Sequence, residues 1–249
     1  MKCTSYTIQA PVQREMKIAL CSDLHDNPCE KALSILREQG PDLIAMPGDI
    51  CEDPHAPVQH AMEFMRACAD IAPTVYSLGN HDKAYDDDPL TASKIRSTGV
   101  VLLDDDDICL NGIWVGGLTT GFRGQKHEGY FSQTPAPNLA WLDQVFCQRE
   151  GFKLLLCHHP EYYPMYLRDR QVSLVLSGHA HGGQWRFFGH GVLAPGQGLF
   201  PKYTSGVHEE RLVISRGMGD HTWIPRLFNP HEVVMIRLVP PNKINERKQ

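Results

Sequence analysis

Five short polar clusters combine residue types that bind metal ions or transfer protons. They are Asp23-Leu24-His25, Gly48-Asp49, Gly79-Asn80-His81-Asp82, His158-His159-Pro160 and Gly178-His179-Ala180-His181. Each cluster follows a short apolar run of the kind that forms a buried strand. Their carboxylate, imidazole and amide groups, with no thiolate, suit Mn²⁺, Fe, Zn²⁺ or a similar divalent ion better than a cysteine-type structural zinc site.

Each cluster taken alone also has an ordinary structural interpretation. Asp23 fits a helix cap, Gly48-Asp49 a turn, and Asn80 a turn residue. A single histidine is more often a surface or core residue than a ligand, and only the spaced pair His179 and His181 divides evenly between the two interpretations. The five clusters in this order, each after a strand-like run, are very hard to assemble by chance and favour one shared site.

The elements that must position these clusters alternate along the first half of the chain. Apolar runs at Lys17–Cys21, Leu43–Met46 and Thr74–Leu78 predict strands, and amphipathic patterns at Glu30–Gln39 and Val58–Asp70 predict helices between them. This order argues for an α/β fold with parallel strands. The carboxyl ends of such strands meet at one edge of the sheet, where α/β proteins place ligand sites.

The second half of the chain is richer in strands. Asn111-Gly112 predicts a tight hairpin turn between Ile108–Leu110 and Ile113–Val115, and Asn138–Gln148 has the apolar spacing of a helix. Further strands are predicted at Leu154–Cys157, Val172–Leu176, Leu212–Ser215 and Val233–Val239. With no linker or repeat, residues 1–249 are expected to form a single domain of two packed sheets with helices outside.

Composition excludes some classes of function. The chain is 42% hydrophobic and 21% charged with a net charge of −5, and it has no basic stripe, so no nucleic-acid binding is expected. Its eight cysteines include no CxxC pair, which is typical of free thiols in a reducing compartment. No run has the length of a signal peptide core or a transmembrane segment, so a cytoplasmic location is expected.

The order D-x-H, G-D, G-N-H-D, H-x-P and G-H-x-H closely resembles the calcineurin-like metallophosphoesterases from Lys17 to Val239. The resemblance implies a four-layer α/β/β/α sandwich of two mixed sheets flanked by helices, with two metal ions, most often Mn, Fe or Zn, at one edge. Carried over by motif, one ion would be held by Asp23, His25 and His181, and the other by Asn80, His158 and His179, with Asp49 bridging both. His159 occupies the variable position of its motif and receives no ligand role.

Such a site hydrolyses phosphate esters by a recognised route. Two neighbouring cations share a bridging hydroxide that attacks phosphorus, and they neutralise charge on the phosphoryl oxygens. His81 matches the catalytic histidine of the family and is the candidate acid for the leaving oxygen. Asp82 is the candidate for orienting the His81 ring, although another carboxylate could do so, and Asp82 could equally cap the following turn.

Three further segments resemble the bacterial YkuE/YaeI-type branch of this family. They are Gly178–Gln184, Ser215–Gly219 and Pro225–Asn229. That branch includes phosphodiesterases and relatives acting on UDP-diacylglucosamine, so a nucleotide-sugar or lipid-linked substrate is implied. Branch members often carry an export signal or membrane anchor, which this sequence does not show, and Asp26-Asn27 departs from their usual apolar residue and glycine.

The leading hypothesis is hydrolysis of a phosphodiester or pyrophosphate bond. A phosphomonoesterase, including a protein phosphatase, would use the same metal site, and an inactive binding scaffold is disfavoured because all seven candidate ligands and His81 are present. Asn80 and Arg216 are candidate substrate contacts; Arg216, like Arg226, could instead tie a loop to a carboxylate, and this structural role is favoured for Arg226. The apolar segment Gly198–Pro201, followed by Lys202 and Tyr203, could form a peripheral membrane contact, but a packed loop is favoured.

Overall fold

Alternation along the strands sorts their apolar side chains into separate layers. The computed structural model describes residues 1–53, 58–83, 89–122, 133–220 and 224–241. In β2 (Met16–Leu20), Ile18 and Leu20 are buried between two sheets, whereas Ala19 between them is buried against helices. Successive side chains of a strand point to opposite faces, so a strand that is apolar throughout needs cover on both sides.

Two six-stranded mixed sheets form the centre of the molecule. The first has the order β1 (Lys2–Gln9), β16 (Glu232–Val239), β2, β3 (Leu43–Met46), β4 (Thr74–Ser77) and β5 (Val101–Leu103). The second has the order β14 (Gly206–His208), β15 (Leu212–Ile214), β9 (Leu174–Ser177), β8 (Lys153–Cys157), β7 (Ile113–Leu118) and β6 (Asp106–Leu110). A shared apolar core, which includes Leu43, Leu154 and Leu176, lies between them.

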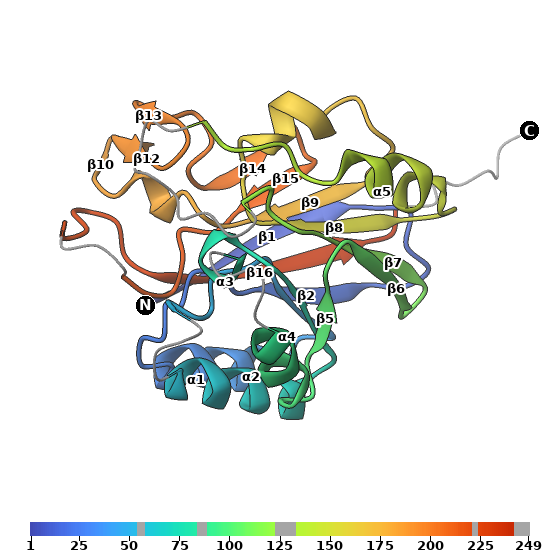
Figure 1. The fold of residues 1–249 in the computed structure, drawn as a ribbon, viewed down its shortest axis with the longest axis horizontal. Helices are drawn as coiled ribbons and strands as arrows, with labels where there is room; N and C mark the ends of the chain where they lie inside the picture. Colours follow the sequence, from blue (N-terminus) through green and yellow to red (C-terminus); the bar gives the residue numbers. More distant parts are fainter. Residues whose placement is uncertain (54–57, 84–88, 123–132, 221–223, 242–249) are drawn as a thin grey trace, which may run out of the picture.

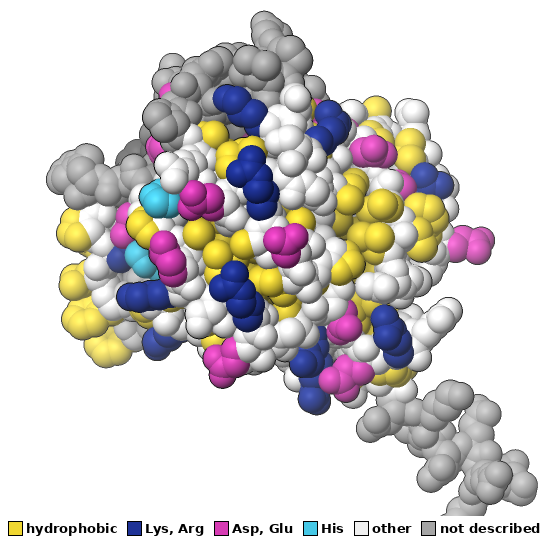
Figure 2. All heavy atoms as spheres, turned by 90° about the horizontal axis from the view of Figure 1, so that it is seen from below, with side chains coloured by type: hydrophobic (Ala, Val, Ile, Leu, Met, Phe, Trp, Pro, Cys, Tyr) yellow, Lys and Arg dark blue, Asp and Glu magenta, His cyan; other side chains and the backbone are white. Residues whose placement is uncertain are grey.

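Helices cover the outer face of each sheet, which completes the predicted four-layer sandwich (Figure 1). The first sheet is covered by α1 (Glu30–Gln39), α2 (Gln59–Ile71) and α4 (Pro89–Arg96). The second is covered by α5 (Leu139–Gln144), the 3₁₀ turn Phe146–Gln148 and the π-helical turn Tyr163–Leu167. On the face that carries the first group of helices, acidic and basic side chains are mixed (Figure 2).

The two chain ends form neighbouring strands that differ from the sequence-based expectation. β16 joins the first sheet, antiparallel to β2, and β1 pairs with β16 in parallel. β1 was not predicted because its residues alternate between exposed and half-buried at the edge of the sheet, with no apolar run. The predicted helix Asn138–Gln148 breaks at Val145 into α5 and a 3₁₀ turn, while Asn138 caps α5 by accepting a hydrogen bond from the backbone N–H of Trp141 at 3.1 Å.

Shorter elements lie around the edge of the sandwich that carries the polar clusters. They are α3 (Asn80–Lys83), the 3₁₀ turn His181–Gly183, the hairpin of β10 (Arg186–Phe187) with β11 (His190–Gly191), and the hairpin of β12 (Leu193–Ala194) with β13 (Gly198–Leu199). Within the described ranges, no helix is long and apolar enough to cross a membrane.

Candidate metal centre

The five polar clusters meet at one edge, where strands of both sheets end. Asp23, Asp49 and Asn80 follow β2, β3 and β4 of the first sheet, and His158 and His179 follow β8 and β9 of the second. Hydrogen bonds join the two halves, because the backbone N–H of His179 donates to Oδ1 of Asp23 at 3.0 Å. The edge is therefore one site built by both sheets.

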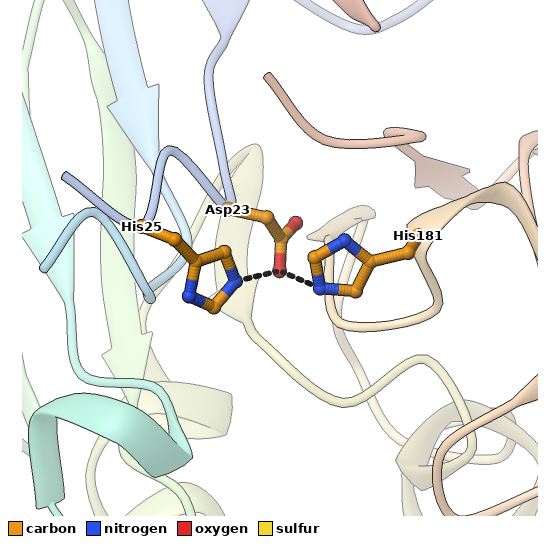
Figure 3. Close-up of side chains that lie close together, drawn as sticks. All are labelled: Asp23, His25 and His181. Atoms are coloured by element: carbon orange, nitrogen blue, oxygen red, sulfur yellow. Dashed lines mark ion pairs between the residues drawn. The ribbon is translucent and has the colours of Figure 1, made fainter. Parts of the chain in front are cut away.

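The first group of candidate ligands consists of Asp23, His25 and His181, all buried, with their ligand atoms within 4.8 Å of one another. The Asp23 carboxylate lies between the two imidazoles (Figure 3). Its Oδ1 is 4.0 Å from Nε2 of His25 and 3.6 Å from Nε2 of His181. One carboxylate and two ring nitrogens around a common point make a donor set that suits a first-row divalent ion.

The second group adjoins the first and contains Asp49, His158 and His179, also buried. Nε2 of His158 lies 2.9 Å from Oδ2 of Asp49 and 3.9 Å from Oδ1 of Asp23. His158 therefore lies next to the carboxylates of both groups. Asn80 is buried beside them, and its Oδ1 has no hydrogen-bond partner among the residues that the structure describes. A buried amide oxygen left this way is costly, and a bound cation would satisfy it. The residues therefore fit a metal.

Hydrogen bonds at Nδ1 fix the orientation of two of the histidine rings. Nδ1 of His158 donates to the carbonyl of Pro47 at 2.7 Å, and Nδ1 of His25 lies 2.6 Å from Oε2 of Glu52. Partners of this kind direct Nε2 toward a metal. His181 differs, because Nη2 of Arg226 donates to its Nδ1 at 3.0 Å, so binding a cation through Nε2 requires that contact to change.

The backbone of this edge adopts a conformation that side chains rarely tolerate. Positive φ angles near 50–60° are found at five candidate ligands, namely Asp23 (53°), His25 (49°), Asp49 (55°), His179 (61°) and His181 (46°). Such residues cost roughly 1–3 kcal/mol each and cluster where function requires the geometry. The neighbouring glycines are required for space: a Cβ on Gly79 would lie 2.2 Å from Oδ1 of Asp49, and one on Gly178 2.3 Å from Oδ2 of Asp23.

Burial and charge act differently on the two central carboxylates. Burial raises the pKa of Asp23, with neighbouring His158 opposing the shift. Burial also acts on Asp49, but the adjacent imidazoles of His158 and His81 outweigh it, so the pKa of Asp49 is lowered. Burial alone would lower the pKa of His158, whereas the Asp49 carboxylate raises it to about 9. The Asp49 carboxylate thus favours a positive charge beside it. A bound metal ion can supply this charge in place of the proton on His158.

His81 lies beside the two groups and is partly open to solvent, with 23% of its side chain exposed. Its backbone N–H donates to Oδ1 of Asp49 at 3.0 Å, and its ring packs edge-on against that of His25 at 4.8 Å. Nδ1 lies 3.0 Å from the carbonyl oxygen of Glu52 and 3.6 Å from its Oε1. His25, Glu52 and His81 form a further group of potential ligands.

The contacts of Asp82 are those of a residue that caps the following turn. Its Oδ2 accepts from the backbone N–H groups of Gly79 and Asp49, both at 2.9 Å, and its Oδ1 accepts from the Tyr76 hydroxyl at 2.7 Å. A side chain at the third position of α3 that bonds the residue before the helix is half of a capping box. Burial raises the pKa of Asp82 to about 6. The carboxylate beside the His81 ring is instead Glu52, which sequence reasoning missed; its only signal was its place three residues after Asp49.

The two arginines near the site hold loops in place. The guanidinium of Arg216 pairs with the buried carboxylate of Glu232, whose Oε1 also accepts from the Arg216 backbone N–H at 3.0 Å. Arg226 donates to Oδ1 of Asp220 and to the carbonyl of Gly219, both at 2.7 Å, as its structural interpretation predicts.

Two further histidines have different surroundings. His159 is fully buried, with Nε2 2.8 Å from the Thr120 hydroxyl and Nδ1 3.3 Å from Oε1 of Glu161. With Glu161 and His179 it forms a fourth potential ligand group. His190 is exposed on β11. Among the other histidines, His127 and His221 lie outside the described residues.

Comparison with known proteins places the chain among metallophosphoesterases. Residues 16–183 match the family described as calcineurin-like phosphoesterase. An uncharacterized metallophosphoesterase of Campylobacter jejuni is 27% identical over 244 residues, covering 94% of this chain and 62% of that protein, and one from Helicobacter pylori is 24% identical over 93% of this chain and 62% of its own length. The chain thus spans less than two thirds of these relatives.

A shorter relative is covered more fully. The phosphodiesterase YaeI of Escherichia coli is 26% identical over 243 residues, covering 90% of this chain and 82% of YaeI. Among solved structures, TT1561 of Thermus thermophilus aligns over 66% of this chain and 81% of that chain, with a TM-score of 0.46 and 17% identity.

Proposed function

Because this chain belongs to the calcineurin-like phosphoesterase family, we propose that its polar edge hydrolyses a phosphodiester or pyrophosphate bond with two bound metal ions. The observation that carries this proposal is the pair of adjoining ligand groups around Asp23 and Asp49, joined through His158. An inactive scaffold would have no need to keep both groups, or to hold their backbone in strained conformations.

In this proposal each ion has its own ligands and one carboxylate serves both. Asp23, His25 and His181 would hold the first ion, and Asn80, His158 and His179 the second, with Asp49 between them. The nitrogen and oxygen donors suit Mn, Fe or Zn. Two such ions supply a hydroxide at neutral pH and neutralise the phosphoryl oxygens.

His81 would donate the proton that the leaving oxygen needs. It lies beside Asp49 and is partly open to solvent. Burial lowers the pKa of His81, but the Asp49 and Glu52 carboxylates more than offset this and raise it. Glu52 would orient the ring. Asp82, expected from the sequence either to orient the His81 ring in catalysis or to cap the following turn, would act only by holding the backbone of Gly79 and Asp49. Arg216 would contact substrate only by leaving Glu232, which makes Asn80 the better candidate for a substrate contact.

The substrate class rests on similarity. YaeI is named a phosphodiesterase, which supports a diester over a monoester; a nucleotide-sugar or lipid-linked phosphate ester fits the same chemistry. All eight cysteines are free thiols, which supports a reducing, cytoplasmic location. The relative in Danio rerio is named a transmembrane protein with a metallophosphoesterase domain, so work near a membrane is also consistent with the family.

The test compares a diester with a monoester. With Mn²⁺ added, we expect bis(p-nitrophenyl) phosphate to be hydrolysed faster than p-nitrophenyl phosphate, and D49N to abolish both activities. D106N, at an exposed aspartate of β6, is the matched control and should be fully active. Faster monoester hydrolysis would assign a phosphomonoesterase, and no hydrolysis with Mn, Fe or Zn would support the scaffold.

A further inference from the structure

Seven large apolar side chains are exposed together on turns next to the metal centre. We call this surface the phenylalanine face; its residues are Trp185, Phe187, Phe188, Leu199, Phe200, Leu227 and Phe228, with exposed fractions of 42% or more. Two of its turns are joined because the rings of Phe187 and Phe228 lie 5.8 Å apart and Trp185 forms a β-bridge with Leu227. The third turn is held near them because the backbone N–H of Phe200 donates to the carbonyl of Val192, just after β11, at 2.8 Å. Hydrophobic side chains gather at the left margin of Figure 2, on the side where β10, β12 and β13 lie in Figure 1.

Three of these phenylalanines occupy the tips of separate turns in an unfavourable backbone conformation. Phe188, Phe200 and Phe228 have φ angles of 50°, 51° and 54° and are 102%, 79% and 73% exposed. Phe188 and Gly189 form the two-residue turn of the β10–β11 hairpin with both φ angles positive, where Asn-Gly is the favoured pair. The folded chain gains little burial from these three rings, so the cost of their backbone conformation points to a contact outside the chain.

The chain segments that carry the face contain no acidic residue. No Asp or Glu occurs between Asp169 and Glu209, or between Asp220 and Glu232, although the chain has 29 acidic residues among 249. Lys202 follows the tip at Phe200, and Arg186 lies within the β10–β11 hairpin. A protein with a net charge of −5 thus presents an apolar face with a locally basic edge, which complements an anionic surface.

From these observations we infer that the phenylalanine face docks on an anionic lipid bilayer, with its aromatic tips inserted at the headgroup boundary. Aromatic side chains beside basic residues are the usual composition of such contacts. Single protruding rings on three turns need no complementary pockets in a fluid bilayer, whereas a folded protein partner would have to supply one for each. The packed-loop alternative for Gly198–Pro201 does not describe Leu199 and Phe200, which are 60% and 79% exposed.

The docked face would bring the metal centre to the membrane surface. Val192 donates to the carbonyl of Gly183 at 3.0 Å, and Leu227 donates to that of Gln184 at 3.3 Å, so the turns are bonded to the segment that follows His181. Asn229 also donates to the His181 carbonyl at 2.7 Å. Resting on the proposed function, this placement identifies the substrate as a phosphate ester in a lipid headgroup; the docking itself does not depend on that function.

The test uses the full chain and vesicles as the probe. We expect the protein to sediment with vesicles of phosphatidylglycerol and phosphatidylcholine, and less with phosphatidylcholine alone. The triple variant F188N/F200N/F228N should bind at least about tenfold more weakly, because each ring contributes apolar burial. Asn tolerates positive φ, so this variant should fold at least as stably as the wild type. M165Q, at an exposed methionine of the π-helical turn, is the matched control and should bind normally.

Two results would overturn the inference. Equal sedimentation of the triple variant and the wild type would show that the tips are not inserted. No vesicle binding, together with self-association that the triple variant loses in sedimentation velocity, would assign the face to a second copy of the chain. Hydrolysis of bis(p-nitrophenyl) phosphate is measured in parallel and should be unchanged in the triple variant. An inactive protein that still binds vesicles would refute the proposed function and leave the docking intact.

Discussion

The metal centre and the phenylalanine face use the same strained backbone for opposite purposes. At the metal centre, residues such as Asp23 and His179 adopt positive φ while their side chains are buried and hydrogen-bonded across both sheets. On the phenylalanine face, Phe188 adopts positive φ with its ring wholly exposed. Strain that persists without compensating contacts inside the chain therefore points to a contact outside it, whereas strain among buried ligands points to a shared ligand within.

The largest difference should appear between removing a histidine of the metal centre and removing one that lies beside the phenylalanine face. H158A should lower hydrolysis roughly 10³–10⁵-fold, because several kcal/mol of metal-derived stabilisation are lost. H190A, on the β10–β11 hairpin, should retain full activity. The rate of hydrolysis by both variants is measured with saturating Mn²⁺. A similar loss of rate in the two variants would contradict the distinction between the regions.

Within the metal centre, His81 should separate catalysis from metal binding. H81A should lower the rate roughly 10²–10⁴-fold while the metal content stays that of the wild type, since general acids contribute about that much. Turnover numbers and elemental analysis of the same preparation provide the two readings. Equal activity at neutral pH, or loss of metal, would remove His81 from its proposed role.

Glu52 should have a smaller effect, because it acts through other residues. E52Q keeps the shape of the side chain but removes the charge beside Nδ1 of His25 and the ring of His81. Partners of metal-bound histidines are worth roughly 10–100-fold in metal affinity or activity. Competition with a chelator measures the affinity; unchanged affinity and rate would show that Glu52 has no positioning role.

The smallest effect concerns the phenylalanine face in the absence of lipid. F188N should raise the midpoint of thermal unfolding by about 1–3 °C, because Asn relieves part of the cost of positive φ and no buried contact is lost. Differential scanning calorimetry measures the shift. A clear drop in stability would mean that the Phe188 ring supports the fold and would weaken the comparison on which the docking surface rests.

The sequence predicted most of the architecture because the central strands are apolar on both faces. Helix α1 was predicted with its observed ends, and the hairpin at Asn111-Gly112 was confirmed. The edge strand β1 was missed because it has no apolar run, and the position of β16 depends on long-range pairing that no local pattern contains.

The candidate site was predictable where a motif follows a strand. The five clusters meet at one edge because the strands before them end there. Glu52 could not be found this way, because its contact with His25 depends on how the loop after Asp49 folds back. The contacts of Asp82 with Tyr76 and backbone N–H groups likewise depend on packing. In the sequence, only the segment Gly198–Pro201 indicated the phenylalanine face, because exposure is a property of the folded chain.

The central claim is that the two ligand groups around Asp23 and Asp49 hold two ions that act together. Its most direct test is the number of metal ions per chain after loading with Mn²⁺, measured alongside hydrolysis of bis(p-nitrophenyl) phosphate. We expect two ions per chain, and activity that rises only as the second ion binds. One ion or fewer, or full activity with a single ion, would contradict the account.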